Sequence, residues 1–118
     1  MSKQIYVYIA GPISQGDTLV NIRRAIDLAE DLLGYGLIPF CPHAMTSMWH
    51  IVHPHSYNKW LEYDFAWIAQ CDALLRIEGP SDGSDLEVDT ASHLGIPVFE
   101  GPKGFARLIK WARYQQSM

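Results

Sequence analysis

Cysteine is scarce in this chain, and long apolar runs are absent. Only Cys41 and Cys71 occur among the 118 residues, and their spacing matches no metal-binding or redox motif. We expect two reduced core thiols rather than a disulfide, as is usual for cytoplasmic proteins. No apolar run approaches the ~20 residues that a bilayer span requires, and the first residues show no signal-peptide plan. The sequence therefore predicts a cytoplasmic protein without a membrane partner.

Basic residues are also few. Nine Lys and Arg residues stand against 13 Asp and Glu residues, which gives a formal net charge of −4. A surface of this charge disfavours polyanions, so we expect no polymeric nucleic acid as a partner. A small anionic ligand is still compatible with the composition, because a local site can oppose the overall charge.

Several catalytic motifs are missing as well. The sequence contains no Gly-x-Ser-x-Gly elbow, no Walker loop and no Gly-x-Gly-x-x-Gly. No acidic pair follows the first predicted strand, which argues against a receiver domain. These absences disfavour a serine hydrolase, an NTPase and a dinucleotide-binding domain.

What the chain does contain is an alternation of apolar strands and helical stretches. Its length and its 48% apolar residues indicate one domain over residues 1–118. Strands are predicted at 5–10, 37–41, 73–77 and 96–99, and helices at about 17–35, 58–70, 84–94 and 103–115. Pro39 favours an edge position for the second strand. This order predicts an α/β protein with a flavodoxin-like (Rossmann-like) three-layer sandwich and a parallel sheet of four to five strands.

In one stretch, from Pro42 to Tyr57, the apolar residues follow neither the helical period nor the alternation of a strand. It holds four histidines, among them His43, and we expect it to be a long functional loop. The histidine spacing matches no standard zinc site, and no adjacent cysteine completes one, so we expect no metal. One or two of these histidines would instead line a pocket beside Trp49.

The carboxyl ends of the predicted strands indicate where a ligand would bind, because open parallel sheets hold their ligands in the crevice beyond those ends. Each of the four loops there contains proline, and three contain Gly-Pro. Gly and Pro by themselves indicate only the ends of strands. The loop over 78–83 is different, because it is rich in side-chain oxygens and runs into a helix.

Glu87, which follows that loop, is a candidate for chemistry. If the helix starts near Ser84, Glu87 lies in its first turn, where the positive end of the helix favours the ionised carboxylate. The backbone N–H groups from Ser81 to Gly83 could alternatively hold an anion. A purely structural interpretation is also open, since Ser84 followed by Glu87 reads as a capping box.

Asp64 is a second candidate acid. Helical spacing places Trp60, Asp64 and Trp67 on one face. An acid between two tryptophans on an inward face would have a raised pKa and could carry a proton at neutral pH. At the edge of the helix it would instead be solvated. We expect Asp72 to form a structural hydrogen bond at the opposite end of the sheet.

An ionised carboxylate and a protonated carboxyl near one crevice suit the cleavage of a glycosidic bond. Glu87 would attack the anomeric carbon of the sugar and form a covalent glycosyl-enzyme. Asp64 would protonate the leaving group and then help to activate the acceptor.

Three blocks of the sequence extend this interpretation. The first is Tyr6 to Ile13, with the letters YVYIAGPI; the second holds two acids, Asp64 and Asp72; the third is Ser81-x-Gly83-x-x-x-Glu87-x-x-x-Ala91. In this order and separation they resemble the nucleoside 2-deoxyribosyltransferase superfamily, which includes the small 2'-deoxynucleoside 5'-phosphate N-hydrolases and phage-associated relatives. The first block resembles the family's opening strand and substrate loop. Asp64 resembles its catalytic acid, and Glu87 matches its nucleophile.

The resemblance implies a small-molecule substrate, a 2'-deoxynucleoside or its 5'-monophosphate. The N-glycosidic bond would be cleaved through a deoxyribosyl-Glu87 intermediate, and the sugar would pass to another nucleobase or to water. No cofactor is implied, and a homodimer or larger homo-oligomer is, with a neighbouring subunit helping to complete the pocket. With the histidine-rich stretch included, the expected substrate contacts are Tyr8, Gly11, Pro12, Ile13, His43, Trp49, Ser81 and Gly83.

The chain departs from the family's pattern in places. Ser81 matches the N-hydrolases, which use this serine on the phosphate, whereas transferases often carry Asp there. The N-hydrolases also have Ser and Arg in the first loop, where this chain has Pro12 and Ser14, so the resemblance only half supports phosphate recognition; Arg23 and Arg24 are candidates to contribute to it. Asp89 replaces the family's usual glycine. Transferase and hydrolase therefore both stay open.

Two functions of other kinds fit the same residues. The first is a non-catalytic nucleotide-binding domain that keeps the pocket for sensing. The second is an NAD glycohydrolase, because related flavodoxin-like domains also use a catalytic glutamate on a ribosyl bond.

Overall fold

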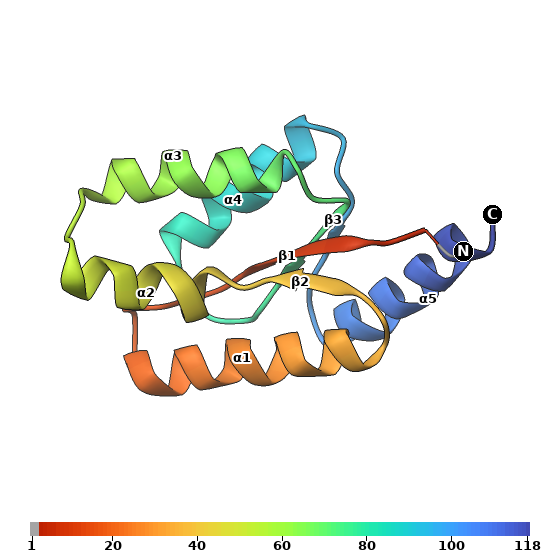
Figure 1. Ribbon diagram of the computed structural model, residues 1–118, viewed down its shortest axis with the longest axis horizontal. Coiled ribbons are helices and arrows are strands. Elements are labelled where there is room, and N and C mark those ends of the chain that lie inside the picture. Colours follow the sequence, from red (N-terminus) through yellow and green to blue (C-terminus); the bar gives the residue numbers. More distant parts are fainter. Residues whose placement is uncertain (1–2) are drawn as a thin grey trace.

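The computed structural model describes residues 3–118, and strands alternate with helices through most of this range (Figure 1). The elements are β1 (Tyr6–Ala10), α1 (Thr18–Gly34), β2 (Ile38–Phe40), α2 (Pro42–Val52), α3 (Tyr57–Ile68), β3 (Ala73–Arg76), α4 (Asp82–His93), β4 (Val98–Phe99) and α5 (Gly104–Ser117). Apart from α2, every element was predicted, and its ends lie within about two residues of the predicted ones.

The four strands form one parallel sheet in the order β2-β1-β3-β4. The chain moves from β1 outward to β2 and then crosses back to β3 and β4, so the direction reverses between β1 and β3. This is the flavodoxin-like arrangement, and it confirms the predicted fold class. Pro39 lies in the edge strand β2, as expected. The carboxyl ends of β1 and β3 lie side by side, with Ala10 opposite Arg76.

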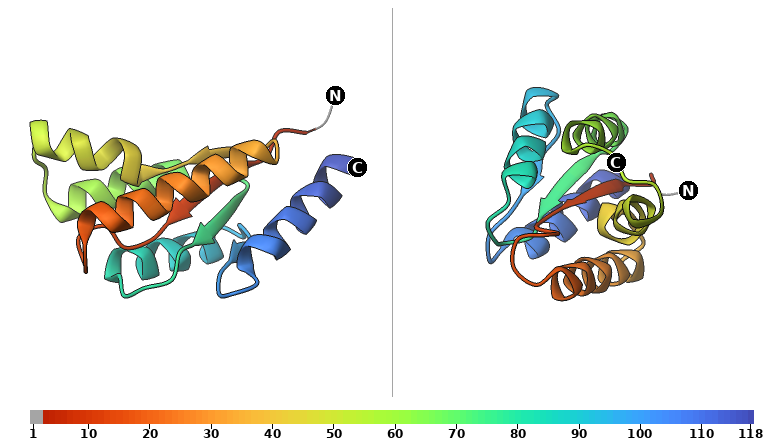
Figure 2. Two further views of the ribbon diagram at one scale, coloured as in Figure 1. Left: turned by 90° about the horizontal axis from the view of Figure 1, so that it is seen from below. Right: turned by 90° about the vertical axis from the view of Figure 1, so that its left-hand side faces the viewer.

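Helices cover both faces of the sheet (Figure 2). On one face, apolar side chains of β1 and β3 pack with α1 and α5; on the other, they pack with α3 and α4. Alternation along β1 decides which residue faces which layer, because successive side chains of a strand point to opposite faces. Val7 and Ile9 belong to the α1 and α5 side, whereas Tyr8 belongs to the α3 and α4 side. The tyrosine is therefore directed toward the two helices that carry Asp64 and Glu87.

The prediction of a long loop from Pro42 to Tyr57 is wrong for the first part of this segment, which forms the helix α2. Pro42 starts this helix, where a missing N–H costs no hydrogen bond. The helix lies between α1 and α3, beyond the end of β2 (Figure 1). Its apolar side chains Met48, Ile51 and Val52 are exposed, so no inward apolar face marked the segment as helical.

The predicted start of α4 near Ser84 is also wrong. The Oγ of Ser81 accepts a hydrogen bond from the backbone N–H of Ser84 at 3.1 Å, so Ser81 is the N-cap and the helix begins at Asp82. The interpretation of Ser84 and Glu87 as a capping box is therefore wrong. Glu87 lies in the second turn of the helix, beyond the first-turn N–H groups that carry most of the helix's positive end.

Two smaller expectations are confirmed. Asp72 accepts a hydrogen bond from the backbone N–H of Tyr6 at 2.8 Å, at the amino ends of β1 and β3. Cys41 and Cys71 are unpaired thiols; Cys71 is buried, as expected of a core thiol, whereas Cys41 is only partly buried. Within residues 3–118, none of the helices has both the length and the apolar character that a membrane crossing requires.

Candidate functional site

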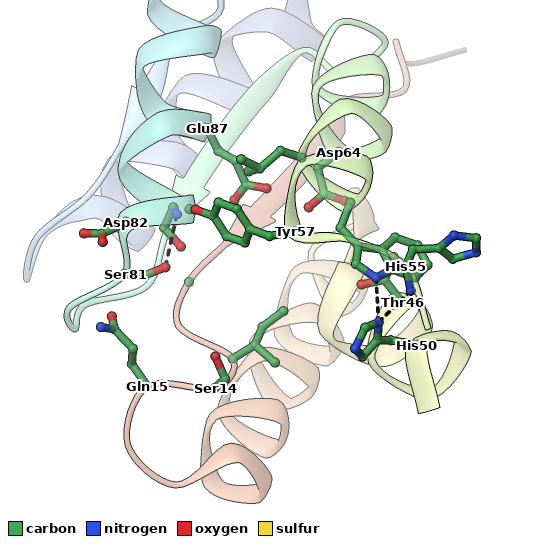
Figure 3. A pocket seen from close by; sticks show the side chains of 16 residues that line it. Ser14, Gln15, Thr46, His50, His55, Tyr57, Asp64, Ser81, Asp82 and Glu87 are labelled. Carbon is green, nitrogen blue, oxygen red and sulfur yellow. Dashed lines mark hydrogen bonds between the residues drawn. The ribbon is translucent and has the colours of Figure 1, made fainter. Parts of the chain in front are cut away.

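A pocket of about 680 Å³ opens at the carboxyl ends of β1 and β3, where the topology predicts a ligand (Figure 3). Its volume lies within the usual range for small-molecule sites. Figure 3 shows Asp64 and Glu87 together at one end of the pocket, with Ser14 and Gln15 opposite them. The lining residues are Gly11, Ile13, Ser14, Gln15, Thr46, His50, His55, Tyr57, Trp60, Leu61, Asp64, Ser81, Asp82, Gly83, Ser84 and Glu87.

Glu87 reaches the pocket from α4 and is buried, with 7% of its surface exposed. The hydroxyl of Tyr8, itself fully buried in the central strand, donates a hydrogen bond to Oε2 of Glu87 at 2.6 Å. Burial raises the pKa of Glu87 well above its usual range, and the negative charge of Asp64 adds to this. The hydrogen bond from Tyr8 and the positive charge of Arg76 act in the opposite direction. The expected ionised carboxylate at a helix end is thus replaced by a buried acid with a raised pKa.

Asp64 faces Glu87 from α3. Burial raises its pKa, as predicted for an acid on the inward face, and hydrogen bonding with Glu87 and Tyr8 opposes the rise. Its Oδ1 is buried without a hydrogen-bond partner among the described residues. Two neighbouring carboxyl groups in a low-dielectric pocket resist carrying two negative charges, so the loss of the second proton from the pair is disfavoured. The arrangement supplies a proton donor and a carboxylate at the same place.

The loop after β1 forms one wall, and close packing with the loop after β3 fixes it. A Cβ on Gly11 would lie 2.9 Å from Cβ of Ile77, and a Cβ on Gly79 would lie 2.9 Å from Cγ of Pro12. Gly79 also has φ +126°, which side chains rarely allow. The Gly-Pro pairs that the sequence marked as ends of strands are therefore contact points between the two loops.

Two buried polar side chains brace the first of these loops from behind. Nε2 of His43 lies 3.1 Å from the carbonyl oxygens of both Gly11 and Pro12, so it must carry the hydrogen and donate. Nδ2 of Asn21 donates to the carbonyls of Ile13 and Gln15 at 3.1 and 2.7 Å. His43, predicted to bind substrate, lies outside the lining and supports the loop instead. Asn21 was missed, because one asparagine on a helix carries no distinguishing sequence signal.

Aromatic side chains of α3 form the opposite wall. Tyr57 and Trp60 line the pocket on the same helical face as Asp64. Nε1 of Trp60 donates to Nδ1 of His50 at 2.8 Å, and this contact joins α3 to α2. Trp49 does not line the pocket; it packs edge-on against Trp60 with ring centroids 5.4 Å apart. The expectation of one or two pocket histidines is met by His50 and His55.

The remaining predicted contacts divide between the lining and the layer behind it. Gly11, Ile13, Ser81 and Gly83 line the pocket, whereas Tyr8 and Pro12 lie behind it. Arg23 pairs with Asp27 at 3.7 Å, and Arg24 donates to the carbonyl of Glu78 at 3.4 Å; neither reaches the pocket. Among residues 3–118, no group of three or more His, Cys, Asp or Glu side chains is arranged to hold a metal ion.

The fold and the pocket define a flavodoxin-like α/β domain whose crevice holds two interacting acids. Residues 5–100 match a protein family described as a domain of unknown function (DUF7768), and the chain belongs to this family. A crystal structure of a conserved protein from Enterococcus faecalis V583 is similar, with a TM-score of 0.70 at 18% sequence identity, over 90% of this chain and 73% of that chain. At this identity the likeness supports the fold alone. No curated protein matches the chain.

Proposed function

We propose that this protein cleaves the N-glycosidic bond of a 2'-deoxynucleoside or its 5'-monophosphate, through a deoxyribosyl-Glu87 intermediate, with transfer of the sugar to another nucleobase or to water. The observation that carries the proposal is the pair of adjoining acids at one end of the pocket, with the Tyr8 hydroxyl 2.6 Å from Glu87. The three sequence blocks that resemble nucleoside 2-deoxyribosyltransferases meet at this point: Tyr8 from the first, Asp64 from the second and Glu87 from the third.

In the first half-reaction, a carboxylate oxygen of Glu87 attacks C1' of the deoxyribose. The bond between C1' and the base nitrogen breaks, and its electron pair leaves with the base. Asp64 donates the proton of the pair to the base, so that a neutral base departs. This step requires the ionised form of Glu87, which the Tyr8 hydroxyl and Arg76 favour against the effect of burial, so the shared proton must lie on Asp64 when the substrate is bound.

In the second half-reaction, water or the nitrogen of a second base attacks C1' from the side that the first base has left. Asp64, now a carboxylate, accepts the proton of this nucleophile. The bond between C1' and Glu87 breaks, and both acids return to their starting state. Attack by water gives the free sugar, and attack by a base gives a new nucleoside.

The pocket also orients the substrate. A base protonated by Asp64 lies beside Trp60, which is one helical turn away and lines the pocket. The aromatic rings of Trp60 and Tyr57 suit a flat heterocycle. The sugar then extends from Glu87 toward Ser14 and Gln15 at the opposite end.

The test incubates the protein with the four deoxynucleosides and their 5'-monophosphates, with and without an acceptor base, and measures free base and exchanged nucleoside. We expect release or exchange by the wild type, and a loss of several orders of magnitude in Glu87→Ala, because the covalent route disappears. Asp89→Asn, on the exposed side of the same helix, is the matched control and should retain activity. Ligand binding without turnover, unaffected by Glu87→Ala, would instead favour a sensing domain, and release of nicotinamide from NAD would favour the glycohydrolase.

We further propose that the protein is cytoplasmic and acts as a homodimer or larger homo-oligomer. Its two unpaired cysteines suit a reducing compartment. Met48, Ile51 and Val52 form an exposed apolar surface on α2, the helix that carries His50 into the pocket wall. Such a surface suits burial against a second copy. The molar mass in solution, measured by light scattering, tests this part of the proposal.

A further inference from the structure

The charges around the pocket narrow the choice between a nucleoside and its monophosphate. Three of the lining residues are carboxylic acids, namely Asp64, Asp82 and Glu87. Within residues 3–118, no lysine or arginine lines the pocket. With one proton held between Asp64 and Glu87, the carboxyl groups leave a net negative charge on the walls. A phosphate group would bring up to two more negative charges into this space.

The cations nearest in sequence to the pocket loops are engaged elsewhere. The guanidinium of Arg76 pairs with Asp85 at 2.8 Å and donates to the carbonyl of Ile77. Arg23 and Arg24 are held by Asp27 and by the carbonyl of Glu78, as described above. None of these three guanidinium groups is therefore directed at a phosphate in the pocket. The imidazoles that line it are those of His55 and of His50, whose Nδ1 already accepts a hydrogen bond from Nε1 of Trp60.

The start of α4 lines the pocket and offers backbone N–H groups that could hold an anion, but acidic side chains lie beside it. Asp82 and Asp85 both lie in the first turn. Their carboxylates complement the positive end of the helix, which a phosphate would otherwise use. The Ser81 oxygen is the acceptor for the N–H of Ser84 and caps the helix. Ser81 thus has a structural role that requires no phosphate.

We infer that the substrate carries a free 5'-hydroxyl, and that Asp82 selects against the 5'-monophosphate. The inference rests on the proposed function for the identity of the sugar. Ser14 and Gln15, on the side of the pocket opposite the acids, supply neutral polar groups that suit a hydroxyl. Asp82 lies beside Ser81 along the side that connects these two ends (Figure 3). Its charge repels a phosphate through space and needs no direct contact with the sugar.

The experiment compares thymidine with thymidine 5'-monophosphate, in equilibrium binding by calorimetry and in turnover. The wild type should bind and use the nucleoside at least about tenfold better, and added salt should narrow the ratio because it screens the exposed carboxylate. Asp82→Asn should reduce the ratio about five- to tenfold by improving the monophosphate, with the nucleoside little changed. Asp89→Asn removes the same charge farther along α4 and should leave the ratio as in the wild type.

The outcomes separate this inference from the proposed function. Preferential binding of the nucleoside without cleavage overturns the proposed reaction and supports the inference about the ligand. Equal or tighter binding of the monophosphate overturns the inference, whether or not cleavage occurs. Binding of neither compound overturns it as well. A ratio that responds equally to Asp82→Asn and Asp89→Asn refutes the role of Asp82.

Discussion

The hydrogen bond from Tyr8 to Glu87 can be removed with little other change. Tyr8→Phe deletes one hydroxyl and keeps the ring, which packs against Phe40 with centroids 5.7 Å apart. The site is fully buried, so no exposed surface confuses the result. Of the two groups that favour a negative Glu87, Arg76 also pairs with Asp85, whereas the Tyr8 hydroxyl has Glu87 as its hydrogen-bond acceptor.

The magnitude follows from the geometry. At 2.6 Å, an O–H donor to a carboxylate forms a short, charge-assisted bond. Such bonds are worth about 1.5–3 kcal/mol, which corresponds to a factor of roughly 10 to 150. The loss should lower kcat/KM by about that factor at neutral pH, because the ionised nucleophile is less populated. The pKa of the acid pair should rise further, so the acid limb of the pH–rate profile should move to higher pH.

Two measurements test this reasoning. The first is the pH–rate profile of Tyr8→Phe, and the second is the carbon-13 NMR titration of the Glu87 carboxyl, which needs no turnover. Tyr6→Phe is the control, because the Tyr6 hydroxyl contacts the exposed Gln4 far from the acids. An unchanged Glu87 titration in Tyr8→Phe would refute the role of the hydroxyl. A shifted titration without any effect on rate would instead separate the electrostatics from the chemistry.

Two further predictions concern stability. Burial raises the pKa of Glu87 in the folded state, so ionisation of this carboxyl destabilises the fold at any pH above its unfolded-state pKa. Glu87→Gln should therefore raise the free energy of unfolding by about 1–2 kcal/mol near pH 7. The same variant should abolish turnover. Urea unfolding near pH 4, where wild-type Glu87 is largely protonated, should show a smaller gain, and an equal gain at both pH values would contradict the argument. Burial lowers the pKa of His43, so its contribution to stability should decline as the pH falls below about 6.5. His43→Ala should lower the free energy of unfolding by about 1–3 kcal/mol, because it leaves the carbonyls of Gly11 and Pro12 unpaired. His43→Gln keeps a hydrogen-bond donor and should lower it less. Equal unfolding midpoints for the wild type and His43→Ala would rule out a supporting role for His43.

The sequence was sufficient to predict a strand, a helix or a helical face wherever the apolar residues followed a strand or helix period. The strands showed two-sided apolar runs, and the spacing of Trp60 and Asp64 placed both on the face of α3 that lines the pocket. It was insufficient for α2, whose apolar side chains face outward and give no amphipathic period. The N-cap of α4 was also misplaced, because Ser81 and Ser84 are both good caps and only the folded backbone chooses between them.

Contacts between segments that are distant in the sequence could not be predicted from local sequence patterns. Tyr8 and Glu87 are separated by 79 residues, and their contact depends on the side of the sheet to which Tyr8 points and on how α4 lies across it. The same holds for His43, whose residue type suggested substrate binding but whose buried position beside the first loop gives it a supporting role. Residue chemistry identified the acids, whereas tertiary packing determined their protonation.

The close packing of Gly11 on Ile77 and of Pro12 on Gly79 has a consequence for protein engineering. The two loops that frame the pocket occupy complementary space, so neither can be exchanged by itself. A graft that brings a longer or bulkier first loop from a related protein would collide with the second loop and displace the start of α4, which carries Asp82 and leads into the turn that carries Glu87. New specificities in this scaffold should therefore be sought by transplanting both loops together, or by varying Trp60 on α3; Tyr57 should be changed together with the second loop, because a Cβ on Gly83 would lie 3.4 Å from its hydroxyl oxygen.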